Sequence, residues 1–320
     1  MRRHLAARLL KSLVVVVIVS TISFFLIRLA PGDPFAYEGA NFTPAIRAQW
    51  RAQFGYDRPV TEQYARYLSS IAHGQFGYSH SGRRPVSEAL ADAIPRTLLL
   101  AGVSLVLSFA LGITLGVVQA TQRGKWLDRA LSGTLLFFYS LPDFWFAIMM
   151  LLVFAFWLPV FPPGGVIDAV MHSYMSPWDA FADRVMHLVL PAVTLTLLTS
   201  AAIARYQRSA MLDVLPMEFV QVARAKGVSE RSIVWRHALR AALTPVITLL
   251  GLLMPVLVGG SLYVETVFNW NGMGLLTADA IRLRDYDLVT AAVVVGAVVV
   301  ALGNLLADLL HAVVDPRLRN

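Results

Sequence analysis

Residues 97–120 read TLLLAGVSLVLSFALGITLGVVQA, a stretch without a single charged side chain. A helix needs about 20 such residues to cross the hydrocarbon core of a bilayer. Five further apolar blocks occupy residues 9–30, 130–158, 188–204, 243–264 and 288–306. The sequence therefore predicts an all-α integral membrane protein with six transmembrane helices.

The composition agrees with a membrane-embedded fold. Hydrophobic residues make up 57% of the chain and charged residues 15%, and the mean hydropathy is +0.62. A soluble domain is about one quarter charged. Cysteine is absent, which excludes disulfides, thiolate metal sites and a cysteine nucleophile. The first apolar block imitates a signal peptide, but its length and the lack of a small-residue cleavage site favour an uncleaved span.

The distribution of basic residues predicts the orientation in the membrane. They concentrate in the N-terminus, in the link at 121–129 and in the link at 205–240. By the positive-inside rule these segments face the cytoplasm, which places both termini inside. The loop at 31–95 is charge-balanced and is expected outside as a small ordered element. The net charge of +7 is then explained by topology, so nucleic-acid binding is not expected.

Small residues recur along one face of the second predicted span. Ser108, Gly112 and Gly116 are spaced four residues apart, which lets another helix approach closely. The partner is either a second subunit or the pore lining, or another helix of this chain. The spacing alone does not decide between these interpretations.

Polar and helix-breaking residues interrupt two other spans. Asp143 follows Pro142 inside an apolar block, so it either marks a polar pathway or caps a helix that begins at Phe144. The second interpretation is favoured, because the run after Asp143 is itself about long enough for a tilted partial span. Pro255, Gly259 and Gly260 allow a bend or hinge in the fifth span.

Signatures of enzymes and metal sites are missing from the sequence. The pair Gly124 and Lys125 is followed by Trp126 and lacks the upstream glycine of a phosphate-binding loop. No HExxH or GxSxG motif is present, and the seven histidines are dispersed along the chain. We therefore expect neither a catalytic centre nor a metal or other cofactor bound by this chain.

The stretch MEFVQVARAKGVSER, residues 217–231, predicts a short helix that stops at a corner. Glu218 suits the start of the helix, where the helix dipole favours a negative charge. Arg224 and Lys226 suit its last turn, and Gly227 suits the left-handed position that ends many helices. The pattern therefore predicts a helix followed by a glycine corner.

A second short helix is expected after the corner. Ser229 is suited to cap it, and it would run through His237 towards the fifth span. With the small Ala223 and Ala225 and a basic rim, the corner suits insertion into the groove of a partner protein. The alternative is a solvated basic loop, but a loop that only sets topology does not need these helix-stop-helix signals.

The same stretch resembles the EAA loop of ATP-binding-cassette importer permeases, specifically the dipeptide/oligopeptide/nickel permease family. That family has a segment like ARAKG (223–227) followed about ten residues later by one like HALR (237–240). Further similar stretches occur in the family's order: RLAPGDP (28–34), IPRTL (94–98), SLP (140–142), HLVLPA (187–192), ETVF (265–268), GMG (272–274) and DPR (315–317). This chain departs from the pattern at Gln221, Ala241, Asn271 and Asp143, where the family has an acid, Asn, Pro and Ser.

The resemblance implies an inner-membrane permease driven by other subunits. The implied partners are a second, similar permease, two cytoplasmic ATPase subunits that use ATP, and an extracytoplasmic solute-binding protein. It divides the chain into the N-terminus with span one (1–30), an external loop (31–95) and a core permease domain (96–320) with a coupling loop at about 205–240. The implied ATPase-coupling residues are Glu218, Gln221, Ala223, Arg224, Ala225, Lys226, Gly227, Ser229 and His237.

Two other classes of membrane protein fit the sequence less well. A secondary transporter or channel predicts paired ionisable residues at mid-membrane and inverted repeats, and neither is evident. An intramembrane enzyme needs a catalytic pair at depth, which a lone Asp143 does not supply. The sequence does not specify the solute, and peptides, metal chelates and glutathione-like molecules all fit the family.

Overall fold

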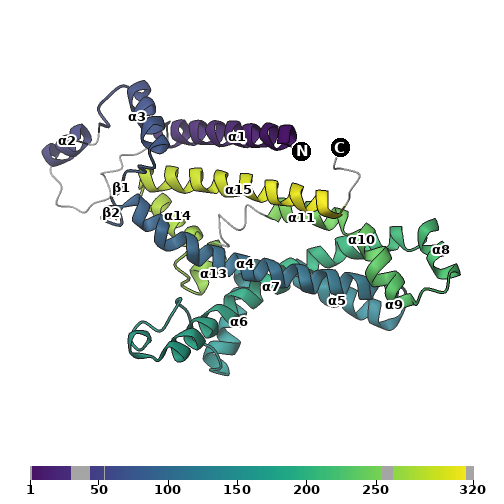
Figure 1. Ribbon diagram of the computed structural model, residues 1–320. Coiled ribbons are helices and arrows are strands. Elements are labelled where there is room, and N and C mark those ends of the chain that lie inside the picture. Colours follow the sequence, from purple (N-terminus) through teal and green to yellow (C-terminus); the bar gives the residue numbers. More distant parts are fainter. Residues whose placement is uncertain (1, 30–43, 54, 254–261, 315–320) are drawn as a thin grey trace.

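The computed structural model describes residues 2–29, 44–53, 55–253 and 262–314. Within these ranges the chain is almost entirely helical, with one small two-stranded hairpin (Figure 1). The prediction of a mostly helical fold is confirmed. Pro255, Gly259 and Gly260, the predicted hinge residues, lie outside the described residues.

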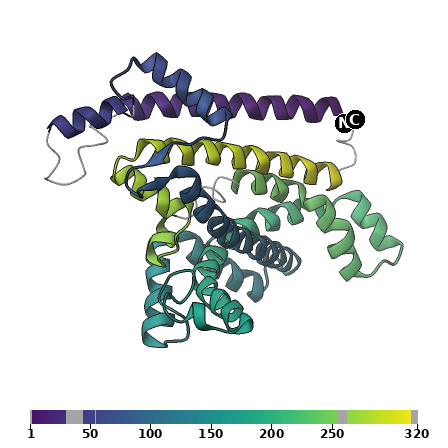
Figure 2. The ribbon, with the colours of Figure 1, turned by 60° about the vertical axis from the view of Figure 1, so that its left-hand side comes forward.

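The N-terminal part contains helices α1 (Arg2–Leu29), α2 (Pro44–Gln53) and α3 (Val60–Ala72), followed by the antiparallel strands β1 (Tyr78–Ser79) and β2 (Arg84–Pro85). Helix α3 packs across the end of α1 through aromatic rings. The ring centroids of Phe24 and Tyr67 are 4.9 Å apart, and Thr21 Oγ1 lies 2.7 Å from the Tyr64 hydroxyl. Helix α1 also lies alongside α15 (Tyr286–Val314) in both views (Figures 1 and 2).

The centre of the molecule is the contact between its two longest described helices, α4 (Val86–Thr121) and α7 (Pro177–Val214). A Cβ on Gly112 would lie 2.7 Å from Ile203 Cβ, and a Cβ on Gly116 would lie 2.7 Å from the Ala204 carbonyl oxygen. Only glycine allows this approach of the two backbones. The small-residue face of the second span is therefore buried against another helix of the same chain.

The third predicted span is broken. A bend of 100° separates α5 (Trp126–Ser140) from α6 (Asp143–Leu151) and the π-helical turn η1 (Leu152–Trp157). Pro142 takes the cap position of α6, so Asp143 is the first helical residue. The prediction that Asp143 caps a helix from Phe144 was therefore wrong by one residue. The chain continues through a loop with one 3₁₀ turn, η2 (His172–Tyr174), into α7.

The segment after α7 is a series of short helices: α8 (Glu218–Ala225), α9 (Glu230–Ser232), the π-helical turn η3 (Ile233–Ala238), α10 (Leu239–Ala242) and α11 (Thr244–Leu253). The predicted link at 205–240 begins later than expected, because α7 continues to Val214. Arg208 therefore lies on α7, where its guanidinium donates two hydrogen bonds of 3.0 Å to the Asp128 carboxylate.

The last part contains α13 (Leu262–Val267), α14 (Met273–Arg282) and α15. Among the described residues, α4, α7 and the first part of α15 are each long and apolar enough to cross a membrane. Two bent pairs, α5 with α6–η1 and Glu230–Ala242 with α11, raise this number to five if each pair is one span. Helix α1 adds the shorter apolar stretch Leu13–Leu29.

Candidate functional site

The predicted corner after α8 is present. Gly227 has a φ of +78°, in the left-handed region that glycine adopts readily. The Val228 N–H donates to the Ala223 carbonyl at 3.2 Å, and the Gly227 N–H donates to the Arg224 carbonyl at 3.0 Å. This pair of hydrogen bonds is the Schellman arrangement, which satisfies the last carbonyls of a helix. The sequence prediction of a helix that stops at Gly227 is confirmed.

An ion pair spans the corner. The Arg224 guanidinium donates to both carboxylate oxygens of Glu230, at 2.5 Å and 3.1 Å, and Arg224 also donates to Gln221 Oε1 at 3.0 Å. The hydrogen bonds from Arg224 lower the pKa of the Glu230 carboxyl. Because the folded pKa is the lower one, this contribution to stability is present at neutral pH and is lost as the pH falls through that pKa.

The inner face of α8 is anchored to the ends of the long helices. Val220 is fully buried in an apolar cluster with Val117 and Ala120 of α4, Met211 of α7 and Ile233 of η3. Val220 therefore joins α8 to the ends of both long helices through direct apolar packing.

The outer face of α8 is apolar and exposed. Phe219 is 45% exposed and Val222 is 52% exposed, and Met217 just before the helix is 47% exposed. Large apolar side chains that are exposed at and beside one short helix are unusual on a protein surface that faces water. Helix α8 lies at the end of the molecule opposite α2 and α3 (Figure 1).

The remaining predicted coupling residues are placed around this corner. Glu218 lies in the first turn of α8, as predicted, and Ala225 and Lys226 lie at its end. Ser229 takes the cap position of α9, as predicted, but its side chain makes no capping hydrogen bond. His237 lies exposed in η3, because the second helix is divided into α9, η3 and α10.

Three short stretches noted in the sequence meet at a buried carboxylate, which the sequence did not reveal. Thr97 Oγ1 donates to Glu265 Oε1 at 3.0 Å and accepts from the Met273 N–H at 2.7 Å. The Leu275 N–H donates to Glu265 Oε2 at 2.9 Å. A Cβ on Gly272 would collide with both Thr97 and Glu265. Glu265 therefore fixes the start of α14 against α4.

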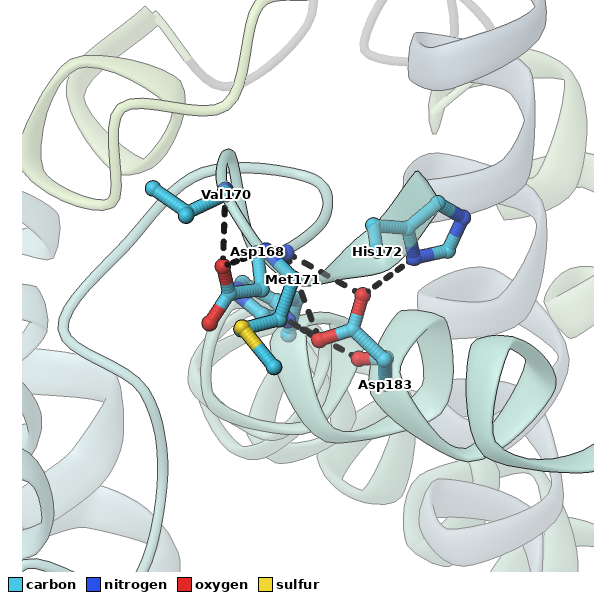
Figure 3. A network of polar contacts seen from close by, with 6 residues as sticks. Asp168, Val170, Met171, His172 and Asp183 are labelled. Carbon is cyan, nitrogen blue, oxygen red and sulfur yellow. Dashed lines mark hydrogen bonds and ion pairs between the residues drawn. The ribbon is translucent and has the colours of Figure 1, made fainter. Parts of the chain in front are cut away.

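A second carboxylate, that of Asp183 on α7, contacts residues of the α6–α7 loop (Figure 3). His172 Nδ1 lies 2.6 Å from Asp183 Oδ2, His187 Nδ1 lies 3.1 Å from Asp183 Oδ1, and the Asp168 N–H donates to Oδ2 at 3.1 Å. The histidines are dispersed in the sequence, but the structure brings His172 and His187 together at Asp183, which corrects the interpretation that they do not cluster. No group of three or more metal-ligating side chains that could hold an ion occurs in the described part of the chain.

Comparison with known proteins identifies the family. The model of "Binding-protein-dependent transport system inner membrane component" matches residues 112–320, and the model of the N-terminal domain of these membrane components matches residues 1–101. The chain belongs to this family. It is therefore a transport permease, and the members of its family are transport components rather than catalytic subunits.

Relatives of this permease match over nearly its full length. The oligopeptide transport system permease protein AppB of Bacillus subtilis (strain 168) is 37% identical and covers 99% of both chains. The dipeptide transport system permease protein DppB of Escherichia coli (strain K12) is 35% identical and covers 94% of both. The resemblance stated from the sequence is confirmed.

A solved structure shares the fold. A chain of the inward-facing MetNI methionine ABC transporter matches with a TM-score of 0.54 at 20% identity, covering 71% of this permease and 96% of that chain. This similarity concerns the fold alone.

Proposed function

We propose that this permease forms the translocation pathway of an ATP-binding-cassette importer for peptides or similar small solutes. It spans the plasma (inner) membrane six times with both termini in the cytoplasm, and α1 supplies the span beyond the five described above. It works with a second permease, two cytoplasmic ATPase subunits and an extracytoplasmic binding protein. The ATPase subunits use the ATP, and this chain binds no cofactor of its own.

The α8 corner is the observation that carries this proposal. Its outer face, Met217, Phe219 and Val222, is apolar and exposed, while Val220 on the inner face is locked against the ends of α4 and α7. A partner that seats this helix and then moves would displace both long helices as a rigid body. That is the mechanical connection through which ATP hydrolysis would switch the pathway between two access states.

The positions of α8 and of α2 and α3 at opposite ends of the molecule support this orientation in the membrane. The basic link and α8 lie at one end of the molecule, and α2 and α3 lie at the other (Figure 1). ATP is available only in the cytoplasm, so the end that carries α8 is the cytoplasmic end of this proposal. The peptide class of solute rests on the relatives, whose names state oligopeptide and dipeptide transport.

Cross-linking tests the proposal directly, because the chain contains no cysteine. Phe219→Cys and Val222→Cys, labelled with a maleimide photo-cross-linker in the complex, are expected to cross-link to the ATPase subunits. Tyr78→Cys, which replaces an exposed side chain at the opposite end, serves as the matched control and should not cross-link to them. Absence of cross-links from both α8 positions in a complex that transports would disprove the assignment of α8.

A further inference from the structure

A polar cavity lies where α1, α3 and α15 meet, away from the α8 corner. Its volume is about 170 Å³. A water molecule needs roughly 10–15 Å³ of such space, so the cavity can hold a small organic molecule. Its polar lining includes Arg28, Gln63, Arg66, Ser70, Gln75 and Asp287.

One wall of the cavity is a cationic donor. The Arg28 guanidinium lies over the Tyr56 ring, 4.1 Å from its centroid, and 5.3 Å from the centroid of Phe24. Its Nη1 atom is buried and has no hydrogen-bond partner among the described residues. Asp287 attracts the guanidinium electrostatically but does not accept a hydrogen bond from Nη1. A buried donor of this kind costs free energy unless something accepts from it.

Hydrogen-bond acceptors line the same cavity. Asp287 from the first turn of α15 supplies a carboxylate, and Gln63 from α3 supplies an amide oxygen. Gln63 Nε2 donates to the Arg58 carbonyl at 2.7 Å, whereas Gln63 Oε1 is buried without a partner in the described structure. The cavity therefore presents an acceptor side as well as a donor side.

Gly77 lies against the Asp287 carboxylate. It has a φ of +84°, and a Cβ there would lie 2.6 Å from Asp287 Oδ2. A side chain at this position would displace Asp287 from its place in the lining. Glycine thus keeps the carboxylate in position beside the cavity.

We propose that this cavity binds a small zwitterion, a free amino acid or a short peptide. The carboxylate of the ligand pairs with Arg28, and its ammonium group pairs with Asp287 and Gln63 Oε1. Such a ligand is the simplest that serves both unpartnered atoms in one small space, since a simple anion offers no donor to Gln63 Oε1 and a simple cation offers no acceptor to Arg28 Nη1. The site belongs to the N-terminal part and α15, and it does not depend on the function proposed for α8.

Calorimetric titration of the assembled transporter in nanodiscs, without ATP or binding protein, tests this site. The probes are glycine, Gly-Gly, N-acetyl-Gly-Gly and Gly-Gly-amide. Saturable binding of glycine identifies a free amino acid as the ligand, and saturable binding of Gly-Gly alone identifies a short peptide. The acetylated probe, which lacks the ammonium group, and the amide, which lacks the carboxylate, are each expected to bind at least tenfold more weakly.

Two variants then assign the charges. Asp287→Asn and Arg28→Gln should each weaken binding of the zwitterion at least tenfold. The exposed pair Arg84 and Asp92, which lies outside the cavity lining, provides the controls Arg84→Gln and Asp92→Asn, and these should bind normally. If a cavity variant fails to fold, the four probes on the unmodified complex still decide the question. No saturable binding, or equal binding of the blocked probes, would overturn the proposal, and a water-filled cavity would remain.

Discussion

Gly227 has a φ of +78°, and nothing lies within 4 Å of the position that a Cβ would take there. Substitution therefore acts through the backbone alone, at a cost of roughly 1–2 kcal/mol for a residue with a Cβ. Gly227→Val should insert into the membrane normally but lose transport and the stimulation of ATP hydrolysis by solute. Gly227→Asn should be milder, because asparagine tolerates this conformation better. ATPase assays on the purified complex measure both variants.

Gly124 provides the matched control. It has the same φ of +78° and equally open surroundings, but it lies in the link between α4 and α5. Gly124→Val introduces the same backbone strain without touching α8, so coupling should survive. Normal transport by Gly227→Val would show that the α8 corner only sets topology.

At the scale of single residues, the sequence predicted the features that depend only on residues close by in the chain. The stop at Gly227 follows from local backbone rules, and the structure has it. The network around Asp183 joins His172 of the α6–α7 loop to the first turns of α7, and the Thr97–Glu265 hydrogen bond joins α4 to α13. Contacts between distant segments depend on the packing of whole helices, which no local pattern encodes.

Helix α4 offers a test of packing between elements. A Cβ on Gly116 would lie 2.6 Å from Gln207 Cβ, whereas nothing lies within 4 Å of a Cβ on Gly102 of the same helix. Gly116→Ala should destabilise the protein by about 1–3 kcal/mol through overpacking and lower its melting temperature. Gly102→Ala should be neutral or slightly stabilising, since alanine favours helix. Thermal melting in detergent compares the two, and equal melting temperatures would contradict the α4–α7 contact.

At the scale of elements, the apolar blocks at 97–120, 188–204 and 288–306 lie within α4, α7 and α15. Hydropathy finds such helices because lipid demands apolar residues over a fixed length. It did not give their full lengths, since α4 and α7 continue beyond the apolar stretch into polar surroundings. The break at Pro142 was visible in the sequence, but its angle of 100° was not, because the neighbouring helices determine it.

The whole molecule is predicted to place α8 inside the cell and α3 outside. Ser229→Cys and Ser69→Cys introduce single cysteines at exposed positions of the two ends. A membrane-impermeant maleimide should label Ser69→Cys in intact cells or spheroplasts, and should label Ser229→Cys only after permeabilisation. Labelling of Ser229→Cys in intact cells would place α8 outside, where no ATPase subunit could reach it.

The energy source is a property of the whole assembly. Gly124 and Lys125 do not form a phosphate-binding loop, because Trp126 follows them and the upstream glycine is missing. Reconstituted alone in liposomes, this permease should therefore neither hydrolyse ATP nor accumulate a peptide. With the second permease, the ATPase subunits and the binding protein, both activities should emerge together. In that complex, Gly227→Val should abolish peptide accumulation and the stimulation of ATP hydrolysis by peptide. Accumulation by the lone chain under an ion gradient would instead identify a secondary transporter. In that case, the exposed face of α8 would have no ATPase to meet.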